Sequence, residues 1–110
     1  MPQEQPTIEE TMQKRKEFAP KLMVLNEKLL FGDIWERPGL SKRDRSLITV
    51  ATLVALYRTN ELPFHIARAR ENGISKDELV ELFMHLAFYA GWPSAMTAIN
   101  IAMQVLAETE

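Results

Sequence analysis

The stretch Leu47-Ile-Thr-Val-Ala-Thr-Leu-Val-Ala-Leu56 is apolar at eight of its ten positions and shows no sustained alternation of apolar and polar residues. A strand exposed on one face alternates with a period of two, whereas an apolar run inside a helical pattern is typical of a buried helix. No other segment of the 110-residue chain alternates either. We therefore expect an all-α protein.

Capping signals divide the chain into five to six expected helices. Ser75-Lys-Asp-Glu78 is a capping box that opens one helix, and Gly73 suits the left-handed position that closes the helix before it. Pro20 interrupts or kinks the first helix, whereas Pro93 fits the first turn of the last one. The expected helices cover residues 7–31 with a break at Pro20, 41–58, 59–72, 75–91 and 93–107.

The composition excludes several classes of protein. Without cysteine, the chain has no disulfide framework, no zinc ribbon and no thiol chemistry. Its 13 basic and 15 acidic residues give no general attraction to nucleic acid or to an anionic membrane. No run approaches the ~20 apolar residues of a membrane span, and the N-terminus lacks the pattern of a signal peptide. We expect a single cytoplasmic domain over residues 1–110 that binds neither nucleic acid nor membrane.

Two expected helices are apolar around most of their circumference, the one with residues 47–56 and the one with residues 95–106. A helix that is apolar nearly all round must be buried nearly all round. Five short helices cannot wrap two others completely, so we expect subunit contacts in a symmetric homo-oligomer to cover the remainder. The alternative is two central helices that leave a few alanines exposed.

A narrow polar line follows the first of these helices, where Arg45, Thr49 and Thr52 are spaced by four and three residues. In one interpretation, the threonines donate hydrogen bonds to carbonyls of their own helix and the arginine is a surface group. In the other, the line is the wall of a pocket in which Arg45 binds a substrate carboxylate. The spacing leaves both interpretations open.

Glu61 and His65 are the strongest candidates for chemistry. Four residues apart, they share one face of a helix, in line with Arg68 and Asn72. A carboxylate beside an imidazole favours imidazolium, so we expect a raised pKa for His65 and partial protonation near neutrality, which suits general acid–base catalysis. The alternative is an ordinary surface pair that stabilises the helix by about 0.2–0.5 kcal/mol, and spacing alone favours it.

Further candidates are polar and aromatic residues that lie outside this pair. His85 and Tyr89 follow one border of an apolar helix face, where a histidine is more often a residue at the edge of the core than a catalyst. Trp35 and Trp92 are expected in loops near proline. In one interpretation they form an aromatic lid or an interface anchor, and in the other each is a hydrophobic plug at a helix junction. His65 and His85 are metal ligands in principle. However, the spacings His-x-x-x-His and Glu-x-x-His are both absent, so we expect no bound metal.

Longer motifs add a family resemblance to these patterns. The stretch Phe31-Gly-Asp-Ile-Trp-Glu-Arg-Pro-Gly-Leu-Ser-Lys-Arg-Asp-Arg-Ser-Leu-Ile-Thr-Val-Ala51 resembles the carboxymuconolactone decarboxylase family. The later motifs of that family follow in order: Glu61-Leu-Pro-Phe-His65, Ala69, Asn72-Gly73 and Tyr89-Ala-Gly-Trp-Pro93. The resemblance covers about residues 31–107, and we expect residues 1–30 to form an N-terminal helical region.

The resemblance implies the all-helical fold of the alkylhydroperoxidase AhpD superfamily, assembled as a homohexamer (a trimer of dimers) or a related ring. It also implies decarboxylation of 4-carboxymuconolactone to the 3-oxoadipate enol-lactone, or of a related small carboxylated lactone, in the breakdown of aromatic compounds and without any cofactor. The alternative is a non-catalytic oligomer of the same fold that binds a small molecule or a partner protein.

The peroxidase branch of this superfamily carries Cys-x-x-Cys followed by a histidine. In that register the cysteine positions fall on Arg58 and Glu61, and the histidine falls on His65. Thiol peroxidase activity is excluded, because no thiolate can form.

The resemblance gives the candidate residues their roles. We expect His65, oriented by Glu61, to protonate the enolate that the loss of carbon dioxide leaves, and Arg45 and Arg58 to stabilise its charge and to bind carboxylates. The residues expected to bind the substrate are Arg45, Thr49, Arg58, His85, Tyr89 and Trp92. The chain departs from the family pattern at Leu56-Tyr57, where small residues are usual, and at Trp92, where a smaller apolar residue is common.

Overall fold

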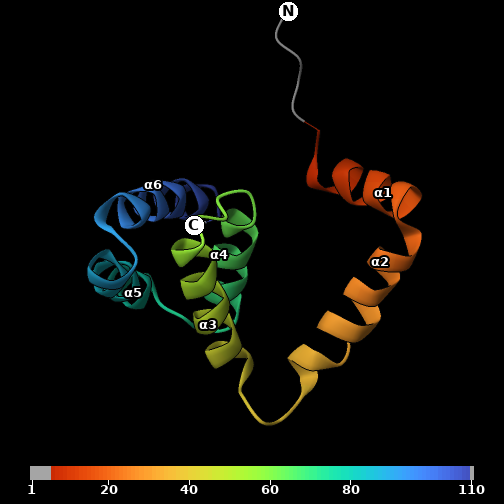
Figure 1. The fold of residues 1–110 in the computed structure, drawn as a ribbon, viewed down its shortest axis with the longest axis horizontal. Helices are drawn as coiled ribbons and strands as arrows, with labels where there is room; N and C mark the ends of the chain where they lie inside the picture. Colours follow the sequence, from red (N-terminus) through yellow and green to blue (C-terminus); the bar gives the residue numbers. More distant parts are fainter. Residues whose placement is uncertain (1–5, 110) are drawn as a thin grey trace, which may run out of the picture. The chain divides into compact units, whose positions relative to one another are not determined.

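The structure, a computed structural model, describes residues 6–109, in which the regular structure is helical and no strand occurs (Figure 1). The expectation of an all-α protein is therefore confirmed. The helices are α1 (Ile8–Phe18), α2 (Pro20–Leu25), the π-helix η1 (Asn26–Phe31), the 3₁₀-helix η2 (Ile34–Glu36), α3 (Lys42–Ala55), α4 (Leu62–Glu71), α5 (Lys76–Tyr89) and α6 (Trp92–Thr109). They belong to two compact units, whose boundary in the sequence lies between Gly39 and Leu40.

The N-terminal unit is a series of short helices with almost no core. Thr7 caps α1 in a capping box with Glu10, whose backbone N–H donates to Thr7 Oγ1 over 3.0 Å. Pro20 opens α2 after a non-helical Ala19, so it does divide the first expected helix. None of the described residues in α1, α2 or η1 is buried.

Among residues 6–39, Trp35 is the one buried residue. Its side chain is 5% exposed and stacks on Phe31, with ring centroids 5.9 Å apart. The structure therefore supports the interpretation of Trp35 as a hydrophobic plug at a helix junction.

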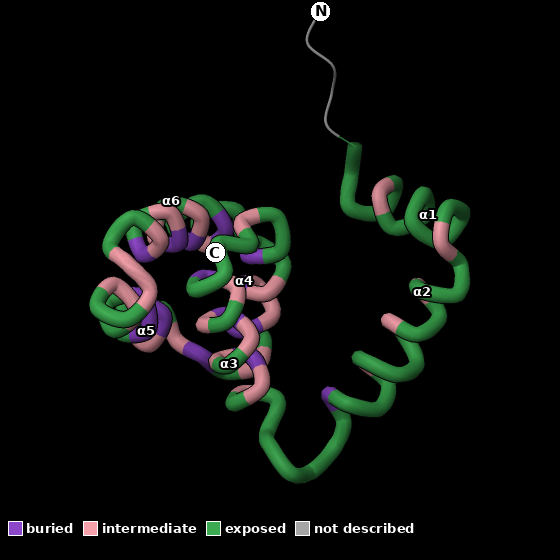
Figure 2. The backbone as a smooth tube through the Cα atoms, viewed as in Figure 1, coloured by how far each residue is buried: buried purple, intermediate pink, exposed green. Residues whose placement is uncertain are grey.

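The C-terminal unit packs four helices around one apolar core, and the buried positions gather in α3, α4, α5 and α6 (Figure 2). Each of α3 and α6 contacts the other three members of this set. The core residues that are at most 1% exposed are Val50, Val54, Leu62, Ile66, Ala69, Ile74, Leu79, Phe83 and Ala98. Within α3, α4 and α5 these residues recur every three or four positions, so the apolar stripes of the sequence are the faces that pack together.

Local signals set most helix ends, as the sequence predicts. Ser41 accepts a hydrogen bond from the Asp44 N–H over 3.0 Å at the start of α3. Ser75 accepts one from the Glu78 N–H over 3.1 Å in the capping box that opens α5. Gly73 follows α4 with a φ of 97°, which is the left-handed conformation expected there.

Two predicted boundaries are wrong, and both lie close to Tyr57. The helix expected over residues 41–58 ends at Ala55, because Tyr57 is left-handed (φ 57°) and the N–H groups of Tyr57 and Arg58 donate back into the last turn. The next helix begins at Leu62 rather than at Thr59. No glycine marks this stop, so the local sequence does not reveal it.

Apolar side chains of α3 and α6 are exposed on the C-terminal unit. Ile48 is 53% exposed and Met103 is 60% exposed. This exposure agrees with the surplus of apolar residues that the sequence shows in both helices. Within residues 6–109, no helix combines the length and the apolar character that crossing a membrane requires.

Candidate active site

The candidate acid–base pair lies at the start of α4. Glu61 is the N-cap residue of this helix, and its side chain is exposed. A turn leads into it, in which the Glu61 N–H donates to the Arg58 carbonyl over 3.3 Å. One helical turn later, the His65 N–H donates to the Glu61 carbonyl over 3.3 Å, and His65 is half-buried. The two side chains thus leave the same edge of the helix, as their spacing predicts.

The pKa of His65 lies below its ordinary value of 6.5, so the predicted rise is wrong. Burial is the largest cause, because an imidazole removed from water is less stable in its charged form. The guanidinium of Arg68 lowers the pKa further, and the carboxylate of Glu61 raises it by less than these two effects lower it. His65 is therefore mostly neutral at pH 7 and accepts protons in the resting protein.

The two threonines of the polar line on α3 have a structural role. Thr49 Oγ1 donates to the Arg45 carbonyl over 2.7 Å, and Thr52 Oγ1 donates to the Ile48 carbonyl over 2.8 Å. Both hydroxyls thus bond to their own helix, as in the first of the two interpretations. Arg45, by contrast, is half-buried, and its Nε atom is shielded from solvent. It is not the freely solvated group that this interpretation assumes.

The remaining aromatic candidates form a row at the end of α5 and the start of α6. His85 stacks on Tyr89 with ring centroids 4.8 Å apart, and Phe88 meets Trp92 edge to face at 6.0 Å. Tyr89 is 79% exposed and Trp92 is 61% exposed, so Trp92 is not a buried plug. Exposed aromatic side chains gathered in this way are typical of surfaces that bind a ligand or another subunit.

A groove of about 490 Å³ lies between α3 and α5. Its lining consists of Leu47, Ala51, Leu82, Leu86, Glu78, Glu81 and His85. Within residues 6–109, His85 is the one predicted site residue that lines it. The groove is therefore not built around Glu61 and His65.

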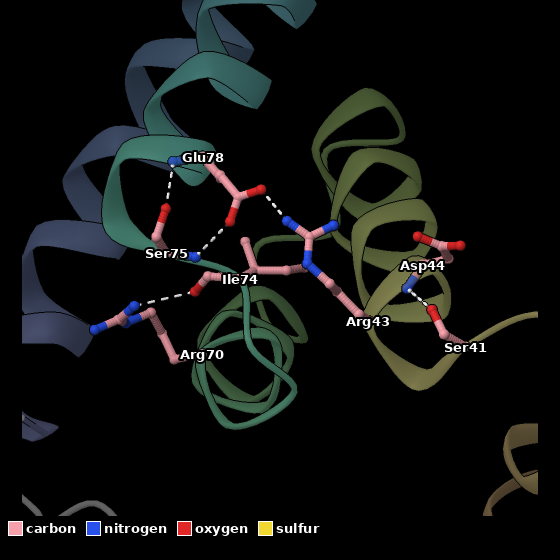
Figure 3. Close-up of polar contacts among 7 residues, drawn as sticks. All are labelled: Ser41, Arg43, Asp44, Arg70, Ile74, Ser75 and Glu78. Carbon is pink, nitrogen blue, oxygen red and sulfur yellow. Dashed lines mark hydrogen bonds and ion pairs between the residues drawn. The ribbon is translucent and has the colours of Figure 1, made fainter.

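Polar contacts join the N-terminal ends of α3 and α5 (Figure 3). Arg43 of α3 forms an ion pair with Glu78 of α5, and the other carboxylate oxygen of Glu78 accepts the Ser75 N–H over 3.0 Å. Arg70 donates to the Ile74 carbonyl over 3.0 Å and so fixes the loop after α4. Glu78 thus has a structural role at one end of the groove.

Tyr57 and Ser46 take positions for which the sequence offers no signal. The Tyr57 hydroxyl lies 3.3 Å from Thr97 Oγ1, which links the end of α3 to α6. Ser46 is fully buried, and Asn72 Nδ2 donates to its Oγ over 2.9 Å. Asn72 therefore joins the end of α4 to α3 instead of extending the polar face of Glu61.

Fold and site together define an all-helical protein with Glu61 and His65 at the start of α4 and with no cysteine. A model of the Carboxymuconolactone decarboxylase family matches residues 20–104. The chain therefore belongs to the carboxymuconolactone decarboxylase family, as the resemblance predicts. The match begins before Phe31, so it also includes α2 and η1.

Three relatives show how far the similarity extends. The chain is 36% identical to the 4-carboxymuconolactone decarboxylase of Acinetobacter baylyi over 98 residues, which are 89% of this chain and 73% of that enzyme. It is 33% identical to the nitrosuccinic acid decarboxylase npaB of Metarhizium robertsii over 76 residues, which are 69% of this chain and about half (53%) of that enzyme. An uncharacterized 15.0 kDa protein of Paracoccus denitrificans is 25% identical over 101 residues, which are 90% of this chain and 75% of that protein.

Proposed function

We propose that the protein is a decarboxylase whose substrate is 4-carboxymuconolactone, converted to the 3-oxoadipate enol-lactone, or a related small carboxylated lactone. The 36% identity to an enzyme named for this substrate supports the substrate class. The observation that carries the proposed chemistry is the half-buried His65 on the same helix edge as Glu61, with a pKa that burial and Arg68 lower.

The proposed reaction breaks the bond between the carboxylate carbon and the ring. The electron pair of this bond passes into the unsaturated lactone as an enolate, carbon dioxide leaves, and the enolate carbon then takes up one proton. Arg45 and Arg58 are proposed to supply positive charge to the enolate oxygen and to a remaining carboxylate. No cofactor takes part in this scheme.

His65 is the proposed proton donor. Since it is neutral at rest, it must first take a proton from solvent, and the substrate favours this step. Substrate carboxylates bring negative charge close to the ring, which opposes the effect of Arg68 and adds to that of Glu61. Proton uptake therefore accompanies substrate binding. We assign the transfer to Nε2, because Nδ1 is buried.

The other predicted residues are proposed to bind the substrate within an assembled protein. Thr49 keeps lone pairs that accept hydrogen bonds, and His85, Tyr89 and Trp92 offer exposed aromatic surface. The proposed assembly is a homohexamer, a trimer of dimers. The exposed apolar residues of α3 and α6 support it, because a subunit contact removes them from water.

A non-catalytic oligomer that binds a small molecule is the second candidate. The observation in its favour is that the groove between α3 and α5 is lined by neither Glu61 nor His65. A protein that only binds a ligand in this groove has no need of the acid–base pair.

An ultraviolet assay that follows the loss of 4-carboxymuconolactone tests the proposal. It compares the wild type with His65→Ala and with Lys76→Ala, a matched control at an exposed position of α5. We expect turnover by the wild type and the control, and little turnover by His65→Ala with its helix content retained. A wild type without turnover rejects this substrate, whereas equal turnover by His65→Ala rejects the site.

A further inference from the structure

Tyr57 follows α3 in a backbone conformation that glycine adopts without steric conflict. Its φ is 57°, which is unfavourable for a side chain as large as that of tyrosine. Its N–H donates to the Val54 carbonyl over 3.1 Å, and the Arg58 N–H donates to the Leu53 carbonyl over 2.8 Å. These two bonds form a Schellman motif, in which the left-handed residue is usually glycine. A tyrosine persists there because other contacts hold it.

The hydroxyl of Tyr57 makes such a contact. It lies 3.3 Å from Thr97 Oγ1 on α6, and either hydroxyl can donate to the other. Thr97 precedes Ala98, which is fully buried in the core, so this part of α6 is held firmly. The Tyr57 side chain itself is 56% exposed and adds little to the core. Its hydrogen bond to Thr97 therefore fixes the direction in which the chain leaves α3.

Backbone hydrogen bonds connect this helix end to the candidate acid–base pair through residues 58–61, called the site turn below. The Arg58 N–H is bonded to α3, and the Arg58 carbonyl accepts the Glu61 N–H over 3.3 Å. The Glu61 carbonyl in turn accepts the His65 N–H over 3.3 Å. The direction of the chain at Tyr57 thus sets where Arg58 and Glu61 lie. All of these residues, like Thr97, belong to the C-terminal unit.

We propose that Tyr57 is a positioning residue, which holds the site turn in place through its hydrogen bond to Thr97. Tyr57 acts through Arg58 and Glu61 and does not touch the substrate. A glycine would form the same Schellman motif without strain, but it would leave the site turn without a bond to α6. The inference rests on the function proposed above, because it assigns Tyr57 a role in the same site.

Amide hydrogen exchange, followed by NMR, tests the positioning without any substrate. Tyr57→Phe removes the hydroxyl and keeps the ring, whereas Thr97→Val removes the partner hydroxyl and keeps the shape of the side chain. In both variants we expect the amides of Arg58 and Glu61 to exchange about two- to tenfold faster, the effect of losing one such hydrogen bond. The Asn72 amide, hydrogen-bonded at the far end of α4, is expected to keep its rate. Unchanged exchange at the site turn overturns the proposal.

A double variant and a matched control separate this hydrogen bond from a general loss of stability. Because each single variant removes the same bond, Tyr57→Phe combined with Thr97→Val should exchange no faster than either alone. Thr109→Val is the control, since it removes another threonine hydroxyl of α6, which donates to the Val105 carbonyl of the same helix. Faster exchange of the site turn in this control, or additive effects in the double variant, overturns the proposal.

Tyr57→Gly tests the role of the side chain apart from the backbone. This variant removes the unfavourable side chain together with the hydroxyl, so we expect it to unfold at a denaturant concentration at least as high as Tyr57→Phe does. We expect its site turn to exchange at least as fast as in Tyr57→Phe. A more stable protein with a less protected turn is a result that a purely structural role does not produce. Slower exchange in Tyr57→Gly than in Tyr57→Phe contradicts the proposal.

The pKa of His65 and the turnover connect the site turn to the proposed reaction. In Tyr57→Phe we expect the pKa of His65 to fall, because a displaced Glu61 carboxylate raises it less. We expect kcat to fall at least about threefold, since small displacements of reacting groups slow a reaction strongly. An unchanged kcat together with faster exchange overturns the positioning role and leaves the proposed function standing. A wild type without turnover rejects the proposed function, and hydrogen exchange then still decides whether Tyr57 holds the turn.

Discussion

His65 and Arg68 lie one turn apart on α4, and the guanidinium of Arg68 acts together with burial to hold the pKa of the imidazole below its ordinary value. Glu61 acts on the same ring in the opposite direction. The pKa of the ring therefore depends on one nearby cation and one nearby anion, and a third charge close to the ring would change it again. An anionic substrate supplies such a charge, which is why we couple substrate binding to proton uptake.

Substitution of either neighbour is expected to move the pKa of His65 in opposite directions. Arg68→Gln removes a cation and raises this pKa, whereas Glu61→Gln removes an anion and lowers it further. The pH titration of the His65 ring signals by NMR measures both shifts. Shifts of the same sign in the two variants contradict the assigned causes.

The unfolding free energy is expected to depend on pH through His65. The pKa of His65 is lower in the folded protein than the 6.5 of an unfolded chain, so between these two values the unfolded state binds more protons. The contribution of His65 to the unfolding free energy is therefore fully present above pH 6.5. It is lost as the pH falls through the pKa of His65 in the folded protein. Denaturant titrations at a series of pH values measure it. In His65→Gln this part of the pH dependence is absent, and parallel curves for the two proteins refute the assignment.

A side chain at Gly73 is expected to destabilise the fold, although there is room for one. Its φ of 97° is unfavourable for an L-residue, while a Cβ built on it meets nothing within 4 Å. Gly73→Ala should therefore lower the unfolding free energy by about 1 kcal/mol, through the backbone alone. Gly39→Ala is the matched control, since its Cβ also meets nothing and its φ is not left-handed. It is expected to be neutral or to stabilise by up to ~1 kcal/mol. Equal losses in the two variants contradict a conformational cause.

Asn72 is expected to matter for stability more than for chemistry. Asn72→Ala removes the donor to the fully buried Ser46 hydroxyl and should lower the unfolding free energy by about 1–3 kcal/mol. Adding Ser46→Ala removes the hydroxyl as well and should recover part of this loss. Thermal and denaturant unfolding of the single and double variants measure the coupling. Additive losses would show that the two side chains do not depend on each other.

The starts of the helices can be predicted from the sequence because the capping residues that set them lie within a few positions of the helix. The side chains of Thr7, Ser41 and Ser75 cap the backbone within three residues, so the sequence alone reveals the geometry. The same holds for Gly73, whose lack of a Cβ suits the conformation it adopts. The end of α3 is different, because Tyr57 adopts a left-handed conformation that its residue type disfavours.

The direction of the pKa shift of His65 could not be predicted from spacing, because burial is its largest cause and no local sequence pattern reveals burial. The spacing of Glu61 and His65 correctly predicts that the carboxylate raises the pKa of the imidazole. Burial of His65 arises from the packing of α4 within the four-helix unit, and this larger effect reverses the net direction. The spacing likewise predicts that Asn72 lies on the same helix face as Glu61 and His65. In the folded protein, however, the Asn72 side chain donates a hydrogen bond to Ser46.

The rate of loss of 4-carboxymuconolactone by His65→Ala, relative to the wild type, tests the central claim most directly. A proton donor typically contributes about 10²–10⁴-fold to the rate. We therefore expect His65→Ala to lose at least about a hundredfold in kcat while its helix content and assembly match those of the wild type. A folded His65→Ala protein with a kcat close to that of the wild type would contradict the account.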